Sequence, residues 1–169
     1  WQSLGFIHGV MNTDNMLITG ETIDYGPCAF MDTFNQATVY SSIDQQGRYA
    51  YQNQPAIAHW NLMTLAQALL PLLHDNEDTA IEQAKATLQT FPDRFDDHYN
   101  AHSAVKLGLT PSKVSRALFA EFLALLETHE LDFTNSFSGL AGRLESNAPL
   151  LATDDWQQWM AQWHAALQD

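Results

Sequence analysis

The pattern of apolar and polar residues divides the chain into two parts, with the change between about residues 55 and 60. In the first part, short apolar runs alternate with turn-forming residues. The segments Met16–Ile18 and Thr22–Tyr25 flank the turn signal Thr19-Gly20-Glu21, which predicts a small β-hairpin. From Pro27 to Pro55 no period of two or of 3.6 residues is sustained, so we predict a long surface loop there.

From about His59 onward the apolar positions recur every three or four residues, which is typical of amphipathic helices. Turn, cap and proline signals place the helix ends. The predicted helices run from about His59 past Pro71, from Glu77 towards Tyr99 with a candidate break at Pro92, onward from a Thr110 cap and Pro111, from a cap at Asp132 or Thr134 towards Leu144, and onward from a cap at Asp154 or Asp155. The fold class is therefore mainly α with a small β part (α+β).

The last predicted helix carries three tryptophans, Trp156, Trp159 and Trp163. Aromatic residues at helical spacing are far more often packed in a core than exposed to stack on a ligand. We therefore interpret them as core. His98 and His102 are four residues apart but lack the glutamate of a zinc-protease motif, so they are weak candidates for a metal site.

The amino-acid composition limits the kinds of partner that the protein can bind. Of 169 residues, 46% are hydrophobic, which is enough for a packed core. There are 20 acidic and 7 basic residues, giving a formal net charge of -13. Such a surface repels a phosphate backbone, so we expect no nucleic-acid partner.

The single cysteine and the distribution of apolar residues bear on the compartment. Cys28 has no second cysteine for an intramolecular disulfide, which favours a reducing compartment: the cytoplasm, or mitochondria in a eukaryote. No uninterrupted run of 18 apolar residues occurs, so we expect no membrane association. The chain opens at Trp1 on an apolar segment without a leader, and we expect the natural protein to continue upstream.

The densest group of polar residues is His8–Asn15, and the predicted hairpin then returns the chain to Asp24. Asn15 and Asp24 are nine residues apart, so a hairpin can bring both side chains to one end. Mg²⁺ is commonly held by one or two protein oxygens together with substrate phosphates. Asn15 and Asp24 are thus candidate ligands for Mg²⁺, or Mn²⁺, and for the phosphates of a nucleotide, as the paired Asn and Asp are in kinases.

The motifs Gly5–Met16 and Thr22–Pro27, within the run Trp1–Phe30, resemble the selenoprotein O (SelO) family, and so do Lys106–Leu109 and Asp132–Phe137. The resemblance implies a protein-kinase-like fold, ATP bound in an inverted orientation, and transfer of AMP to hydroxyl side chains of proteins. It also implies that this chain is the C-terminal lobe of that fold. Residues 1–55 would hold the catalytic loop, the metal-binding hairpin and the long loop, and residues 56–169 the helical part of the same lobe.

The kinase pattern H-R-D-x-x-x-x-N explains why such a protein is called a pseudokinase. His8 falls on the His and Asn15 on the Asn, which leaves Val10 at the position of the catalytic Asp. Asp14 is the nearby carboxylate that can replace it as general base, although an Asp there can also cap a turn. His8 is expected to tie the loop to the core.

Together these features predict part of a protein adenylyltransferase whose substrates are ATP and the Ser, Thr or Tyr hydroxyls of proteins. The Lys and Glu that contact and orient phosphates in kinases have no place in this chain, so we expect it to need an N-terminal lobe of the same protein and to be inactive alone. The alternative is a catalytically silent lobe that acts as a nucleotide-sensing or protein-binding scaffold.

Overall fold

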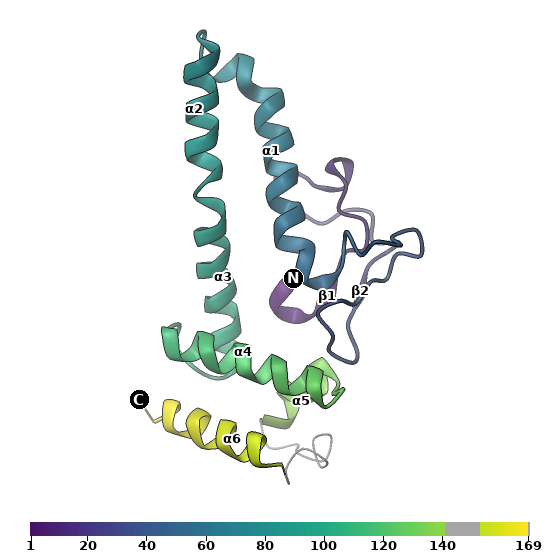
Figure 1. The fold of residues 1–169 in the computed structure, drawn as a ribbon, viewed down its shortest axis with the longest axis vertical. Coiled ribbons are helices and arrows are strands. Elements are labelled where there is room, and N and C mark those ends of the chain that lie inside the picture. Colours follow the sequence, from purple (N-terminus) through teal and green to yellow (C-terminus); the bar gives the residue numbers. More distant parts are fainter. Residues whose placement is uncertain (141–152, 169) are drawn as a thin grey trace. The chain divides into compact units, whose positions relative to one another are not determined.

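The computed structural model describes residues 1–140 and 153–168, and within them the chain is mainly helical (Figure 1). The helices are α1 Gln54–Leu73, α2 Glu77–Leu88, α3 Phe91–Lys106, α4 Lys113–Thr128, α5 Phe133–Leu140 and α6 Asp154–Ala166. Short 3₁₀ helices cover Gln2–Leu4, Thr13–Asn15 and Tyr51–Asn53. Strands β1 (Phe6–Ile7) and β2 (Ala29–Phe30) form a two-stranded sheet. A mainly helical fold with a small β part is as predicted.

The chain folds into two compact units. Each unit contains residues from before and after residue 55, the boundary between the two predicted parts of the sequence. One consists of residues 1–6, 30–38 and 98–169, and the other of residues 7–29 and 39–97. We call them the aromatic unit and the loop unit, after the ring cluster and the His8–Asn15 loop that they contain.

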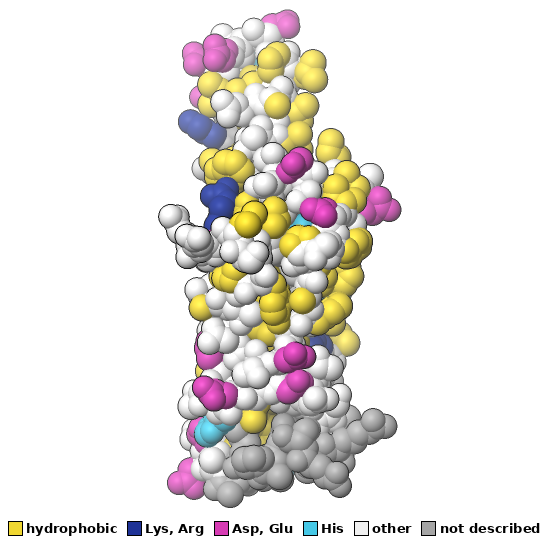
Figure 2. Space-filling view, turned by 90° about the vertical axis from the view of Figure 1, so that its right-hand side faces the viewer, with side chains coloured by type: hydrophobic (Ala, Val, Ile, Leu, Met, Phe, Trp, Pro, Cys, Tyr) yellow, Lys and Arg dark blue, Asp and Glu magenta, His cyan; other side chains and the backbone are white. Residues whose placement is uncertain are grey.

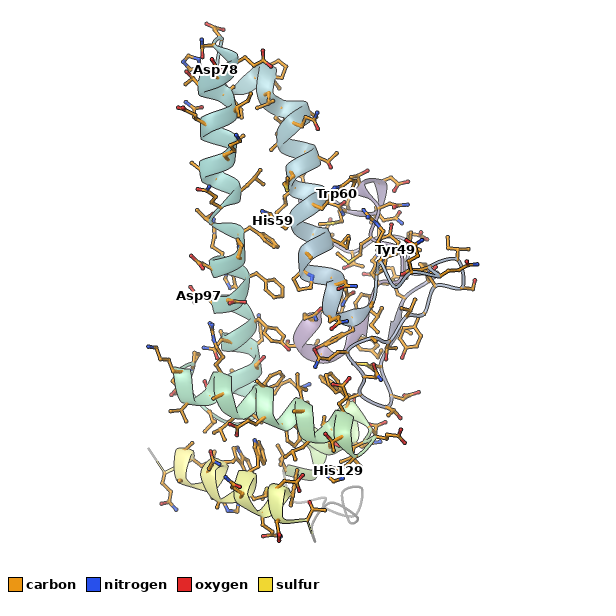
Figure 3. The ribbon with its side chains drawn as sticks, in the orientation of Figure 1. Tyr49, His59, Trp60, Asp78, Asp97 and His129 are labelled. Carbon is orange, nitrogen blue, oxygen red and sulfur yellow. The ribbon has the colours of Figure 1, made fainter. Side chains whose placement is uncertain are left out.

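In the loop unit, α1 and α2 lie side by side (Figure 1). The small buried residues Ala80 and Ala84 give α2 the flat face that this close packing needs. Asn76 caps α2 by accepting a hydrogen bond from the Thr79 N–H at 2.9 Å. His59 points from α1 toward the start of α3, where its ring stacks on Phe91 with 5.1 Å between centroids (Figure 3).

The aromatic unit is built around rings from α4, α5 and α6. Trp156 and Trp159 are almost fully buried and contact Phe122 with centroid distances of 6.0 and 4.7 Å. The indole N–H of Trp159 donates to the Leu118 carbonyl at 2.9 Å, and that of Trp163 donates to Leu107 at 2.8 Å. The prediction that these tryptophans are core is confirmed. At the end of α4, His129 lies 3.2 Å from Asp155 of α6 (Figure 3).

Two predicted N-caps were wrong by one or two residues. Ser112, not Thr110, caps α4: its hydroxyl accepts from the Ser115 N–H at 3.0 Å, and the Ser115 hydroxyl accepts from the Ser112 N–H at 2.8 Å. This reciprocal pair satisfies two backbone donors at once, which a cap at Thr110 would not. At α6 the N-cap is Thr153, and the predicted caps Asp154 and Asp155 lie in the first turn.

Three other helix boundaries can be compared with the structure. The cap predicted at Asp132 is confirmed, because its Oδ1 accepts from the Asn135 N–H at 2.6 Å. The predicted end of that helix near Leu144 lies outside the described residues. The break in the second predicted helix falls at Gln89–Thr90, just before Pro92, which occupies the first turn of α3 where its missing N–H costs nothing.

The predicted β-hairpin is not present within residues 13–28, all of which the structure describes. A single antiparallel bridge joins Met16 and Thr22 instead. Asn15 ends a 3₁₀ helix on one arm, and Asp24 adopts a φ of 53° on the other, so too little extended backbone remains for a ladder. The chain's sheet forms instead between β1 and β2.

The segment Tyr51–Leu73 is long and apolar enough, by length and composition, to cross a membrane, and an 18-residue window within it has a mean hydropathy of 1.3. This finding differs from the sequence expectation, which rests on the lack of an uninterrupted run of 18 apolar residues, because polar residues interrupt the segment. Two of these, Gln54 and Asn61, are buried and make hydrogen bonds within the loop unit. Helix α1 therefore has a polar side as well as apolar residues that remain exposed, such as Trp60, Met63 and Leu72.

Candidate functional site

The loop His8–Asn15 is held against the returning arm Ile23–Pro27 by His8. This side chain is buried, and its Nε2 lies 2.8 Å from the carbonyl oxygen of Ile23. Because a carbonyl only accepts, Nε2 carries the proton, and Nδ1 is left to accept from the Val10 N–H at 3.4 Å. His8 thus joins the two arms of the site, in the structural role that we predicted.

Gly9 lets the two arms approach more closely than any other residue would. Its φ is 84°, and a Cβ at this position would lie 2.4 Å from the carbonyl oxygen of Pro27. A side chain would therefore suffer both backbone strain and a collision with main-chain atoms. Sequence reasoning had not singled out Gly9, because the need for glycine arises from contact with residues far along the chain.

Asn15 and Asp24, the predicted metal ligands, are brought together. The Asn15 side-chain N–H₂ donates to the Val10 carbonyl at 3.0 Å and to Asp24 Oδ2 at 3.3 Å. With its nitrogen engaged in this way, the amide oxygen of Asn15 is left to accept or to ligate. The two arms achieve this proximity through tight turns rather than through a hairpin ladder.

This donor set suits a hard cation held together with phosphates. One amide oxygen and one carboxylate are the number and kind of protein ligands that Mg²⁺ takes when phosphates complete its shell. No group of three or more His, Cys, Asp or Glu side chains able to hold a metal occurs among residues 1–140 and 153–168. A site made only of protein ligands, as for structural zinc, is therefore not formed in that part of the chain.

Asp14, the predicted base, lies on the 3₁₀ helix Thr13–Asn15 directly before Asn15, and it is exposed. The N-cap of this short helix is Asn12, and within residues 8–28 the structure shows no hydrogen bond from a backbone N–H to the Asp14 carboxylate. The alternative role as a turn cap therefore has no hydrogen bond to support it. The carboxylate is open to a substrate.

Three polar residues from outside the motif anchor the loop. Gln54, at the start of α1, accepts from the His8 N–H at 3.0 Å, and Asn61 donates to the Met11 carbonyl at 2.9 Å. The Tyr49 hydroxyl donates to the side-chain oxygen of Asn12. Sequence reasoning missed all three. A usable signal was that Gln54 and Asn61 are polar residues seven positions apart, and so on one face, in an apolar helix.

Cys28 lies beside the site without forming part of its proposed chemistry. Its thiol is 3.7 Å from the main-chain oxygen of Asp24. Burial, and then the nearby Asp24 carboxylate, raise the pKa of the Cys28 thiol above its ordinary value. The thiol therefore stays protonated near neutral pH and is a poor nucleophile.

The loop brings the Asn15 amide and the Asp24 carboxylate together next to the exposed carboxylate of Asp14, and hydrogen bonds from α1 anchor it. The chain matches the family described as "Protein adenylyltransferase SelO" over residues 1–169, and it belongs to that family.

Relatives named "Protein nucleotidyltransferase YdiU" resemble most or nearly all of the chain. The one from Geobacillus kaustophilus is 48% identical over 168 residues, covering 99% of this chain and 35% of its own length. The one from Mycolicibacterium smegmatis is 49% identical over 168 residues, covering 98% and 34%. The one from Anoxybacillus flavithermus is 56% identical over 141 residues, covering 83% and 29%. The chain therefore spans about a third of the length of these relatives.

Proposed function

We propose that this chain supplies the metal-binding and catalytic loop of a protein adenylyltransferase, which transfers AMP from ATP to Ser, Thr or Tyr hydroxyls of proteins. The observation that carries the proposal is the 3.3 Å contact between Asn15 and Asp24 next to the open carboxylate of Asp14. Membership of the SelO family and the names of the relatives support the same reaction class.

In this proposal, Asn15 and Asp24 hold Mg²⁺, or Mn²⁺, through their side-chain oxygens. The bound cation neutralises charge on the phosphates of ATP. The Asn15 N–H₂ bonds to Val10 and Asp24 fix the orientation of both ligands before the nucleotide arrives. Preorganisation of this kind explains why the loop is anchored at several points.

Asp14 acts as the general base. It accepts the proton of the substrate hydroxyl as the hydroxyl oxygen forms a bond to the α-phosphorus of ATP, and the bond from that phosphorus to the bridging oxygen breaks. Pyrophosphate leaves and AMP remains on the protein. Val10 stands where a kinase has its base, so the carboxylate lies four residues further along the chain. A displaced base is compatible with attack on a phosphorus other than the γ.

We use the term full-length protein for a protein as long as these relatives, of which this chain would form about a third. The other two thirds are proposed to supply the lobe that contacts the phosphates. The chain of 169 residues is expected to bind Mg-ATP weakly and to show no turnover alone. Its proposed partners are ATP, protein substrates and the rest of its own protein, and its proposed location is the cytoplasm. Neither nucleic acid nor membrane enters the proposal.

A silent scaffold is the second candidate, and Val10 favours it because an aliphatic side chain accepts no proton. The two carboxylates distinguish the candidates. In the full-length protein, Asp24→Ala should abolish both Mg²⁺-dependent ATP binding and activity. Asp14→Ala should keep most of the binding and lower turnover by about 10²–10⁴-fold, the usual contribution of a general base.

Calorimetry with Mg-ATP and a turnover assay measure this difference. Asp75→Ala, an exposed acid between α1 and α2 in the same unit, is the matched control and should change neither quantity. Equal loss of ATP binding in the Asp14 and Asp24 variants would contradict the assigned roles. Full activity in Asp14→Ala would remove the base from the proposal.

A further inference from the structure

A hollow of about 360 Å³ lies beside the proposed catalytic loop. Val10 and Asn12 form one wall, and residues between Ile43 and Tyr49 form the other. Its volume falls at the lower end of the range for ligand pockets, about 300–1,000 Å³. Because Val10 and Asn12 belong to the loop that carries Asp14, the hollow lies beside the loop of the proposed base.

The second wall is a fixed structure. The Asp44 carboxylate accepts from the Arg48 N–H at 2.9 Å and from the Tyr49 N–H at 2.8 Å, which closes the turn. The Tyr49 hydroxyl donates to Asn12 and joins this wall to the loop. The hollow and the catalytic loop therefore keep one geometry relative to each other. The Asp44 carboxylate is also occupied by main-chain donors.

Arg48 places a positive charge at this hollow. Its guanidinium carbon lies 4.9 Å from the Trp60 ring centroid and 5.7 Å from that of Tyr49. Figure 3 shows Trp60 on α1 and Tyr49 on the neighbouring loop. The structure shows no carboxylate within ion-pair distance of this guanidinium in the loop unit, all of whose residues are described. Stacking on rings holds the side chain in place and leaves its N–H groups able to donate.

The position of this charge is unusual in so acidic a protein. The chain has 7 basic and 20 acidic residues, and on the face drawn in Figure 2 Lys and Arg are sparse. Within the loop unit the other cations are Lys85 on α2 and Arg94 on α3. Arg48 is therefore the cation of this unit that lines the hollow, and its guanidinium offers N–H donors there, whereas the Asp44 carboxylate in the same lining already accepts two main-chain N–H groups.

We propose that the hollow receives the segment of the protein substrate that carries the target hydroxyl, and that Arg48 binds an Asp or Glu side chain close to that hydroxyl. This inference rests on the proposed function and adds a substrate preference to it. Arginine suits the role because its planar donors can grip a carboxylate in a bidentate manner, and the stacked rings have already ordered the side chain.

Peptide binding tests the preference separately from catalysis. The probes are two synthetic peptides with a single Thr, flanked in one by Glu and in the other by Gln, and fluorescence anisotropy measures their binding to the full-length protein. We expect about tenfold tighter binding of the Glu peptide, the scale of one charge-assisted contact. Arg48→Gln should remove the difference, and Arg48→Lys should keep part of it.

Arg94→Gln is the matched control, since Arg94 is an exposed arginine of the same unit away from the hollow, and it should leave the preference unchanged. Thermal unfolding shows whether each variant is folded. Equal binding of the two peptides by the unaltered protein would overturn the inference, whether or not AMP is transferred. So would an Arg48→Gln variant whose KM for ATP rises while its peptide preference stays, because Arg48 would then bind the nucleotide's phosphates.

A Glu-peptide preference that depends on Arg48, in a protein that transfers no AMP, would leave this inference standing and would refute the proposed function. AMP transfer at equal rates to both peptides, with equal binding, would do the reverse. The two proposals can therefore fail independently.

Discussion

In the aromatic unit, rings fill the core, whereas around the loop His8–Asn15 the buried contacts are hydrogen bonds. Phe122 and Trp156 exclude water over large apolar areas, and the indole N–H groups find carbonyl partners. In the loop unit, the buried polar residues Gln54 and Asn61 each hydrogen-bond to the loop. The buried side chain of His8, within the loop, hydrogen-bonds to Ile23 on the returning arm. Apolar burial adds stability in proportion to area, while a hydrogen bond adds little stability but fixes a position.

This difference indicates that the aromatic unit mainly provides stability and that the contacts around the loop mainly fix the geometry of the proposed site. Substitutions in the aromatic unit should lower the free energy of unfolding without changing the chemistry of molecules that remain folded. Substitutions around the loop should change the geometry of the proposed site even where they cost little stability. The predictions below run from the largest expected effect on stability to the smallest.

Trp156→Ala should have the largest effect. Trp156 is fully buried against Phe122 and Trp159, and truncating such a side chain typically costs about 3–5 kcal/mol. Urea unfolding of the chain measures the loss. At a temperature where the variant is still folded, Mg-ATP affinity of the full-length protein should stay within about twofold of the original. A large loss of affinity in folded molecules would break the comparison.

Gly9→Ala should affect both stability and the site. The φ of 84° and the 2.4 Å approach to Pro27 predict a loss of about 2 kcal/mol or more, from strain and displacement of the returning arm. Because that arm carries Asp24, Mg-ATP affinity and turnover should fall as well. Gly20→Ala is the control: it has a φ of 77° but nothing within 4 Å of the added Cβ. It should lower stability by strain alone and leave affinity unchanged.

The pH dependence of stability should reveal Lys106 in the aromatic unit. Its ammonium group lies 4.3 and 4.0 Å from the ring centroids of Phe133 and Phe137, and burial lowers the pKa of Lys106 to about 8 from its ordinary 10.5. The folded state thus binds fewer protons than the unfolded state between these values. Stability should therefore rise as pH increases from about 8 to about 10.

The free energy of unfolding should increase by about 1–2 kcal/mol over this pH range. The increase is limited because the Lys106 side chain is partly exposed and the ring faces favour its ammonium form. Lys106→Met should be more stable than the original near pH 7, and the difference should shrink toward pH 10. Denaturant unfolding at a series of pH values tests this. An unchanged dependence on pH in Lys106→Met would show that another group is responsible.

The difference between the ring-filled core and the hydrogen-bonded loop also explains which features could be predicted from the sequence. Helix α4 and the stripe of Trp156, Trp159 and Trp163 follow from local periodicity, and the structure confirms both. The helix caps were harder to predict because several residues able to cap a helix are neighbours in the sequence. The choice of Ser112 at α4, and of Thr153 at α6, depends on the local backbone and its hydrogen bonds.

The contacts that anchor the loop could not be read from the sequence. They join residues 46, 50 and 37 positions apart, namely Gln54 with His8, Asn61 with Met11, and Tyr49 with Asn12. No short-range pattern encodes such pairs. The proximity of Asn15 to Asp24 was predicted, but through a hairpin, and the structure achieves it with a 3₁₀ helix and a residue at positive φ. Their metal-binding role and the role of Asp14 stay predictions.

The most direct test of the central claim is the fate of the ATP phosphorus atoms. The full-length protein is incubated with Mg²⁺ and ATP labelled separately at the α and γ positions, with Asp24→Ala as the inactive control. We expect protein to acquire the α label and none of the γ label, because AMP is transferred and pyrophosphate leaves. Labelling from the γ position would make this a kinase, and no labelling from either position would leave the silent scaffold; each result would contradict the account.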